Sequence, residues 1–255
     1  MLVALVLGAG AQAADRVVDW HSTIRIGADG LLSVTERIAL EVDGGELSRG
    51  LRRELAAEHR DRFGGRANVP LELVSVKRDG ADEAWTLLPG ERGERIITGP
   101  LARGPHTYEL EYRTALQVGH FADHDELFWP LHAEEWTTGV GHISAEVLLP
   151  RPVVANELRA EAYTGARGAR GRDYQSMIRD GAVGFTSTVA FAPHQGMAIV
   201  VGFPKGVVQP PSLWQRATWY LSSNPRTLAG FAVLAVLGGG FLYRRKARRE
   251  PSPSA

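Results

Sequence analysis

The chain has 255 residues, a formal net charge of zero and no cysteine. The balanced charge argues against a nucleic-acid partner, because proteins that bind nucleic acids carry clustered Lys and Arg. The lack of cysteine excludes disulfides, thiol nucleophiles and cysteine-ligated zinc. Apolar residues make up 44% of the chain, which is enough to build a hydrophobic core.

The first stretch, MLVALVLGAGAQA, is apolar and ends in Ala11-Gln12-Ala13, a small-x-small cleavage pattern. Polar chain begins at Asp15. The pattern predicts a signal peptide over residues 1–14 that sends the rest of the chain out of the cytoplasm. No Lys or Arg precedes the apolar run, so this signal peptide is incomplete or begins upstream. An uncleaved anchor and a buried strand are the alternatives.

Alternating apolar and polar residues predict that the exported part opens with an antiparallel strand pair. In RVVDWHSTIRI (16–26) four apolar positions share one face of a strand, namely Val18, Trp20, Ile24 and Ile26. Asp29-Gly30 follows where a hairpin turn is expected. The apolar stripe resumes in LLSVTERIALEV (31–42), but Glu36 interrupts it.

Further short apolar runs follow, separated by Gly, Pro and Asp: VPLELVSVKRDG, ERIITG, HTYELEYRTAL, HISAEVLLP, AVGFTSTVAF and MAIVVGFPKG. Many short strands with turn residues between them predict a mainly β fold, an antiparallel β-sandwich over residues 15–208. A second sub-domain can begin at about residue 151, and GARGARGRD (165–173) is expected to be a flexible loop. LRRELAAEHRDRF (51–63) departs from the strand pattern and is open to two interpretations, a short helix or a charged loop.

The C-terminal part predicts a membrane anchor. LAGFAVLAVLGGGFLY has no charged residue and, with Thr227, is long enough for one transmembrane helix over 227–243. A linker over 209–226 precedes it, and its Pro210-Pro211 favours an extended chain. The tail over 244–255 is basic, and the positive-inside rule places it in the cytoplasm. The alternative is a buried hydrophobic helix with a basic tail.

Several segments resemble one bacterial and archaeal family. They are DGLLSVTERIAL, RGLRREL, LELVSVKRDG, HTYELEYRT and, most specific, FADHDELFWPLHAEEW followed by ISAEVLLP. In this order they resemble the N-terminal extracytoplasmic domain of the predicted membrane proteins of domain-of-unknown-function family 2207, over nearly all of residues 15–206. The resemblance implies an exported domain followed by a transmembrane helix. It brings no established activity, cofactor or catalytic residue.

Two departures from the family pattern stand out. Pro130 occupies a position where the family is expected to have a polar residue. The chain also stops at Ala255, where such proteins usually continue into more membrane helices. It therefore looks like a short version of the family protein or an interrupted gene.

The segment FADHDELFWP gathers groups suited to chemistry. Asp123, His124, Asp125 and Glu126, with His120 just before the segment, offer carboxylates and imidazoles for a divalent cation or for acid–base work. In an extended chain Asp123 and Asp125 point away from His124 and Glu126, so neither face alone supplies enough ligands. The structural interpretation is a long connection folded onto the sandwich, in which hydrogen bonds fix a turn. Four apolar side chains would then bury surface, namely Leu127, Phe128, Trp129 and Trp136.

Arg49, Arg52 and Arg53 in SRGLRREL form a second cluster. Guanidinium groups bind carboxylates and phosphates bidentately, so one interpretation is a docking patch for an anionic ligand. The alternatives are an ion-pair partner for the acidic segment and a solvated face. If Arg52 pairs with Asp125, exchanging the two charges should restore the stability that either single change removes.

No nucleophile motif or catalytic constellation is present, so we expect no catalytic, cofactor-binding or metal-binding residues. The candidate ligand-binding or structural cluster is Asp123, His124, Asp125, Glu126, Trp129, Trp136, Arg49, Arg52 and Arg53. We expect a single-pass plasma-membrane protein that contacts the lipid bilayer through 227–243, with its N-terminal domain outside the cytoplasm. That domain is expected to be a non-enzymatic binding or assembly module for an envelope protein or polysaccharide. The alternatives are a metal-dependent or hydrolytic envelope enzyme that uses residues 123–126, and a truncated member of a larger membrane protein.

Overall fold

The computed structural model describes residues 14–56, 58–60, 66–90, 93–131, 136–215 and 218. Over these residues the chain is mainly β, as predicted. The predicted transmembrane helix over 227–243 and the basic tail lie outside the described residues, as does the predicted signal peptide except for Ala14. Within the described ranges, no helix combines the length and the apolar character needed to cross a bilayer.

Most of the described residues, from 14 to 56 and from 69 to 210, form one compact unit. The hairpin of β4 (Glu58–Arg60) and β5 (Arg66–Asn68) belongs to a second unit, together with the described residues from 211 onward. The rest of this subsection concerns the first unit, which we call the β unit.

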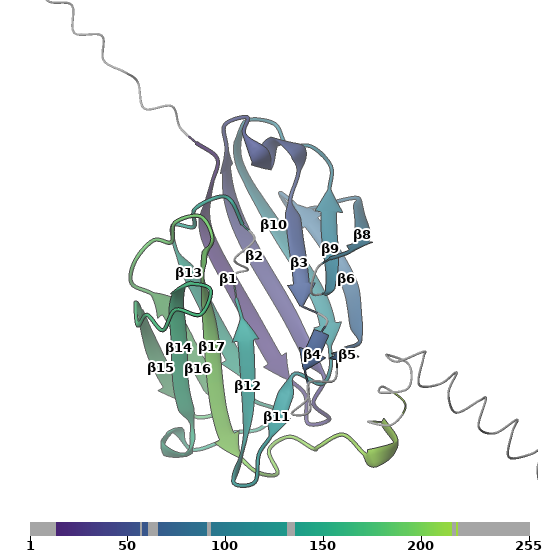
Figure 1. Ribbon diagram of the computed structural model, residues 1–255, viewed down its shortest axis with the longest axis vertical. Helices are drawn as coiled ribbons and strands as arrows, with labels where there is room; N and C mark the ends of the chain where they lie inside the picture. The colour runs from purple at the N-terminus through teal and green to yellow at the C-terminus, as the bar shows by residue number, and fades with distance from the viewer. Residues whose placement is uncertain are drawn as a thin grey trace, which may run out of the picture. The chain divides into compact units, whose positions relative to one another are not determined.

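An eight-stranded sheet forms the larger layer of the β unit. Its order is β15-β16-β13-β1-β2-β10-β6-β7 (Figure 1), with β1 (Arg16–Ile26), β2 (Leu32–Val42), β6 (Leu71–Arg78), β7 (Ala81–Asp82), β10 (Gly104–Thr114), β13 (Ile143–Leu148), β15 (Tyr174–Arg179) and β16 (Ala182–Ser187).

Two smaller sheets cover one face of the large sheet (Figure 1). One has the order β11-β12-β17-β14 and the other β3-β9-β8, with β3 (Arg52–Ala56), β8 (Trp85–Pro89), β9 (Gly93–Thr98), β11 (Val118–His120), β12 (His124–Pro130), β14 (Arg159–Ala166) and β17 (Gln195–Pro204). Short 3₁₀ helices, η1 (Glu46–Arg49) and η2 (Ala155–Glu157), lie in connections. Tyr112 of β10 stacks on Trp129 of β12, which joins the two layers.

One strand pair departs from the predicted antiparallel sandwich. β1 and β13 run parallel, with Trp20 opposite Ile143 and Arg25 opposite Leu148. The chain between β1 and β13 passes through β12 in the other layer, so these two strands are not joined by a hairpin. Parallel neighbours require a connection of this kind. The prediction of a purely antiparallel arrangement is therefore wrong at this pair.

The strands after residue 151 complete sheets that begin before it. β16 pairs with β13 in the large sheet, and β17 pairs with β12 in the second layer. β14 then adds to the free side of β17. Over the described residues, the chain after residue 151 therefore extends both existing layers and does not build sheets of its own.

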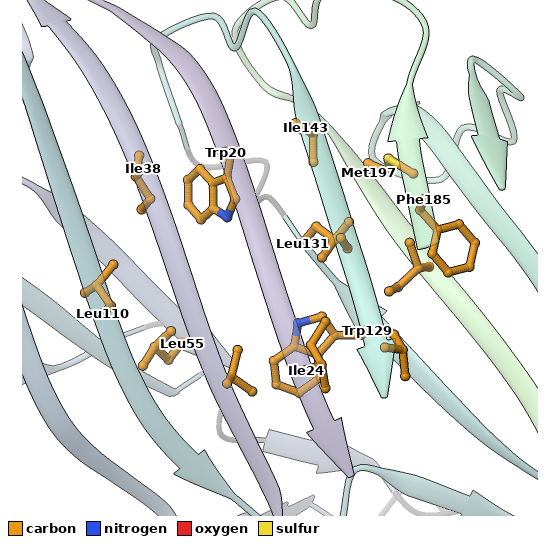
Figure 2. Packing of buried hydrophobic residues seen from close by; sticks show 14 of the residues in the cluster. Trp20, Ile24, Ile38, Leu55, Leu110, Trp129, Leu131, Ile143, Phe185 and Met197 are labelled. Atoms are coloured by element: carbon orange, nitrogen blue, oxygen red, sulfur yellow. The ribbon is translucent and has the colours of Figure 1, made fainter. Parts of the chain in front are cut away.

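The core lies between the layers and follows the period-two pattern of the sequence. Trp20 and Ile24 of β1, Ile38 of β2 and Leu110 of β10 are fully buried in one cluster with side chains from the smaller sheets (Figure 2). Val18 is the exception among the apolar positions predicted to face the core in β1, because it is exposed while Val17 is buried. The register between β1 and β2 shifts between Val17 and Asp19, and this β-bulge turns Val18 outward.

The described part of the segment 51–63 has neither of the two expected structures. Its first part is strand β3, paired with β9, and residues 58–60 form β4. Leu51, Arg53 and Leu55 are buried at alternate positions, whereas Arg52 between them is exposed. The sequence did not show this period-two pattern, because arginine is usually exposed and Arg53 was therefore expected on the surface.

The backbone at Gly50 fixes the start of β3. Gly50 has a φ of 104° and a ψ of 167°, a region open to glycine alone. An added Cβ would lie 2.4 Å from the carbonyl oxygens of Thr98 and Gly99, which belong to the chain at the end of β9. Any side chain at this position would therefore separate β3 from β9.

We predict that Gly50→Ala lowers the free energy of unfolding by about 2 kcal/mol or more, because strain and a backbone clash add. Gly80→Ala is the matched control: Gly80 also has a positive φ, of 84°, but open space around its Cα. That change should cost about 1 kcal/mol from the backbone conformation alone. Urea unfolding of both variants tests this, and equal losses would contradict the close approach at Gly50.

Candidate functional site

A buried ion pair links the β3 sheet to the large sheet. Arg53 Nε donates to Glu36 Oε2 at 2.9 Å, and Arg53 Nη2 donates to Glu36 Oε1 at 2.8 Å. The Tyr112 hydroxyl donates to the same carboxylate at 2.9 Å. Glu36 is 0% exposed. The residue that interrupts the apolar stripe of β2 is therefore part of the core, and Arg53 is its partner.

Aromatic rings surround this pair. The Arg53 guanidinium lies over the Trp20 ring, 4.9 Å from its centroid, and Trp20 meets Trp136 edge-on at 5.3 Å. Burial, followed by the neighbouring Glu36 carboxylate, raises the pKa of Tyr112 well above its ordinary value. Tyr112 therefore stays protonated and keeps its hydroxyl proton for the hydrogen bond to Glu36.

The acidic segment is a strand, so its interpretation as a long connection is wrong. β12 lies between β11 and β17, and its side chains alternate between the two faces of the sheet. Asp125, Leu127 and Trp129 are buried, as period two requires. Phe128 points outward and is exposed, which corrects its predicted burial.

The four charged residues of this segment have separate surroundings. Asp125 is buried and accepts hydrogen bonds from His120 Nδ1 at 2.8 Å and from Lys205 Nζ at 2.6 Å. Asp123 is exposed and accepts a hydrogen bond from His124 Nδ1, which lowers the pKa of Asp123. Glu126 lies 3.7 Å from His124 Nε2 on the outer face. Over the described ranges, no three His, Asp or Glu side chains converge as a metal site.

The arginines do not pair with the acidic segment as one interpretation expected. Arg53 binds Glu36, Arg49 lies 3.6 Å from Glu46, and Asp125 is taken by His120 and Lys205. No ion pair joins Arg52 to Asp125. The charge exchange between Arg52 and Asp125 is therefore not expected to restore stability.

A cleft of about 210 Å³ collects Arg52 and Trp136. Charged and hydroxyl side chains form much of its lining, namely Glu46, Arg52, Glu54, Arg95, Thr137 and Thr138. Glu54 is held by Arg95 at 2.8 Å, and the Thr137 hydroxyl donates to Glu46. Arg52 is exposed and has no carboxylate partner among the residues that the structure describes. Among the described residues, the cleft therefore offers one guanidinium that is not engaged in an ion pair, together with the Trp136 side chain in its lining.

Sequence reasoning missed the structural roles of Glu36 and Lys205, and it placed His120 among possible cation ligands without pairing it with Asp125. Glu36 could have been found, because an acid on the buried stripe of a strand requires a buried partner. His120 and Lys205 lie five and eighty residues from Asp125, and no periodicity connects them. Only the pairing of β11, β12 and β17 brings them together.

We predict that Arg53→Met lowers the free energy of unfolding by about 3–5 kcal/mol, because it leaves the Glu36 carboxylate buried without its counter-charge. Adding Glu36→Leu should recover most of this loss, since an apolar pair removes both desolvated charges. Arg52→Met, one residue away and exposed, should change the stability by less than about 0.5 kcal/mol. Urea unfolding measures all three, and equal effects of Arg52→Met and Arg53→Met would contradict the assignment.

Comparisons with known proteins give a family. The model of a family described as predicted membrane protein (DUF2207), N-terminal domain, matches residues 16–203. No curated protein matches the sequence. Among solved structures, native yeast LTA4 hydrolase has a TM-score of 0.48 at 13% identity, covering 74% of this chain and 29% of its own. The M1 zinc metallopeptidase from Deinococcus radiodurans has a TM-score of 0.40 at 13% identity, covering 75% of this chain and 43% of its own.

The chain spans less than half the length of these two solved structures, and at such low scores the likeness supports no inference about activity. The family match is different, because it takes in most of the chain and nearly the whole β unit. The chain belongs to the DUF2207 family of predicted membrane proteins, and residues 16–203 are its N-terminal domain.

Proposed function

We propose that this protein is a single-pass membrane protein whose β unit lies outside the cytoplasm and works as a non-enzymatic binding module. Its partner is a component of the cell envelope that presents a carboxylate or phosphate group. Membership of a family of predicted membrane proteins supports the membrane attachment. The uncharged run before the basic tail supports the orientation, with the C-terminus in the cytoplasm.

The observation that carries the binding proposal is the cleft at Arg52. A guanidinium that has no carboxylate partner among the described residues, in a cleft that Trp136 also lines, suits an anionic group that can accept two parallel hydrogen bonds. Arg53 is committed to Glu36 and Arg95 is held by Glu54, so neither competes for this role. Arg52 is therefore the residue that we assign to ligand binding.

The size of the cleft limits what can enter. Sites for whole small molecules usually measure about 300–1,000 Å³. The cleft is smaller, at about 210 Å³, so it suits one terminal group or side chain of a larger partner. A macromolecular partner that inserts a single acidic group into the cleft satisfies both the size and the charge.

We predict that Arg52→Gln removes about nine-tenths or more of the envelope partner recovered by the full-length protein from gently solubilised membranes. Loss of one charge-assisted interaction of about 1.5–3 kcal/mol corresponds to roughly tenfold or more in affinity. Arg37→Gln is the matched control, because it removes the same charge from an exposed arginine on the outer face of β2. Equal recovery by both variants, or no partner recovered by the unmodified protein, would count against the proposal.

The proposed topology makes a separate prediction. A tag placed after Ala255 should resist protease added to intact cells and become accessible only after permeabilisation. Protease sites in the β unit should be reached once the outer barrier of the envelope is opened, while the inner membrane remains sealed. Digestion of the C-terminal tag from outside would show the opposite orientation. Recovery of the protein in the soluble fraction would contradict the membrane anchor itself.

A further inference from the structure

Connections from both layers meet at one end of the β unit, the lower end in Figure 1. The β1–β2 turn lies there, and the register of Arg25 with Leu148 places the end of β13 beside it. The β11–β12 turn belongs to the same end, because His124 pairs with Pro204 at the close of β17. We call this the exit end.

The chain leaves the β unit at this end. After β17, Lys205 Nζ donates to the carbonyl of Phe121 at 2.8 Å. Gln209 then donates its backbone N–H to the carbonyl of Ala28 in the β1–β2 turn at 2.8 Å. Val207 and Val208 between them are buried. The start of the linker is therefore bonded to two of the connections of the exit end.

Three of these connections each present an apolar side chain to solvent. Leu31 follows the β1–β2 turn and is 40% exposed, Phe121 lies in the β11–β12 turn and is 51% exposed, and Val154 follows β13 and is 58% exposed. Neighbouring strands lie about 4.8 Å apart and packed layers about 10 Å apart. The three side chains therefore lie on connections of the same end of the β unit.

Hydrogen bonds hold these three positions in place. Leu31 N–H donates to Asp29 Oδ1 at 3.0 Å, and Phe121 N–H donates to the carbonyl of His124 at 3.0 Å. Val154 precedes η2, where its carbonyl accepts the Glu157 N–H at 2.9 Å. Because the backbone is fixed, the exposed side chains cannot fold back into the core without breaking these contacts.

We propose that the exit end lies against the outer surface of the lipid bilayer and that Leu31, Phe121 and Val154 enter that surface. This inference rests on the membrane anchor of the proposed function. At no more than about 3.6 Å per residue, residues 209–226 keep the exit point within roughly 65 Å of the bilayer. The linker to the proposed anchor thus starts from this end of the β unit. Apolar groups on fixed turns gain by leaving water at such a surface.

Single-cysteine labelling can test this without background, because the natural chain has no cysteine. The full-length protein would carry Leu31→Cys, Phe121→Cys or Val154→Cys, each labelled with an environment-sensitive nitrobenzoxadiazole dye. Val189→Cys is the matched control: Val189 is similarly apolar and 47% exposed, and it lies in the β16–β17 connection at the opposite end. Each protein would be reconstituted into phosphatidylethanolamine and phosphatidylglycerol vesicles with and without doxyl-labelled lipid.

We expect doxyl lipid to quench the three exit-end dyes at least twofold more than the dye at position 189. Unquenched dyes on a protein that floats with the vesicles would overturn the inference and leave the anchor intact. Equal quenching at all four positions would overturn it too, because contact would not be specific to this end. Dyes shielded from aqueous iodide but not quenched by lipid would show contact with a second copy instead. A protein that fails to float would overturn the proposed anchor and this inference together.

Discussion

The ion pair between Arg53 and Glu36 is the constraint on which the arrangement of the two layers depends. β3 carries few apolar side chains, yet it covers the large sheet at β2. A carboxylate in a core is costly unless every hydrogen-bonding position is used. Arg53 and Tyr112 supply three donors to Glu36, and the Trp20 ring lies beneath the guanidinium. A slip of β3 by one residue would expose Arg53 and leave the buried Glu36 carboxylate without its counter-charge. The ion pair therefore specifies the register of β3.

The same pair separates two adjacent arginines that look equivalent in the sequence. Because side chains alternate along a strand, burial of Arg53 directs Arg52 to the opposite face. There it lines the cleft with Trp136, whose ring packs on Trp20 below. Arg53, with the structural role, and Arg52, with the proposed binding role, thus lie on opposite faces of one short strand. The acidic segment plays a comparable structural part, since Asp125 ties β11 to the chain after β17.

Much of this fold could be predicted from the sequence, because half-buried strands leave a period-two pattern. The hairpin of β1 and β2 and the runs that become β6, β10, β13, β16 and β17 carry that pattern. The prediction failed where the burial of a side chain depends on a partner that is distant in the sequence. The bulge that exposes Val18 is set by pairing with β2, and the sequence did not reveal β3 because two of its buried residues, Arg53 and Glu54, are charged. The sequence did not reveal β12 because it carries a run of charged residues. One of them, Asp125, is neutralised by Lys205, which lies eighty residues later in the sequence.

The most direct test of this account is the solvent exchange of the Arg53 Nε proton, followed by nuclear magnetic resonance in the full-length protein. A guanidinium that is buried and bonded through Nε should give a slowly exchanging signal, since exchange requires the layers to open. The account predicts that this signal persists when the Arg52 Nε proton has exchanged, and that Glu36→Gln weakens its protection. An Arg53 proton that exchanges as fast as that of Arg52 would contradict the claim that this pair holds the two layers together.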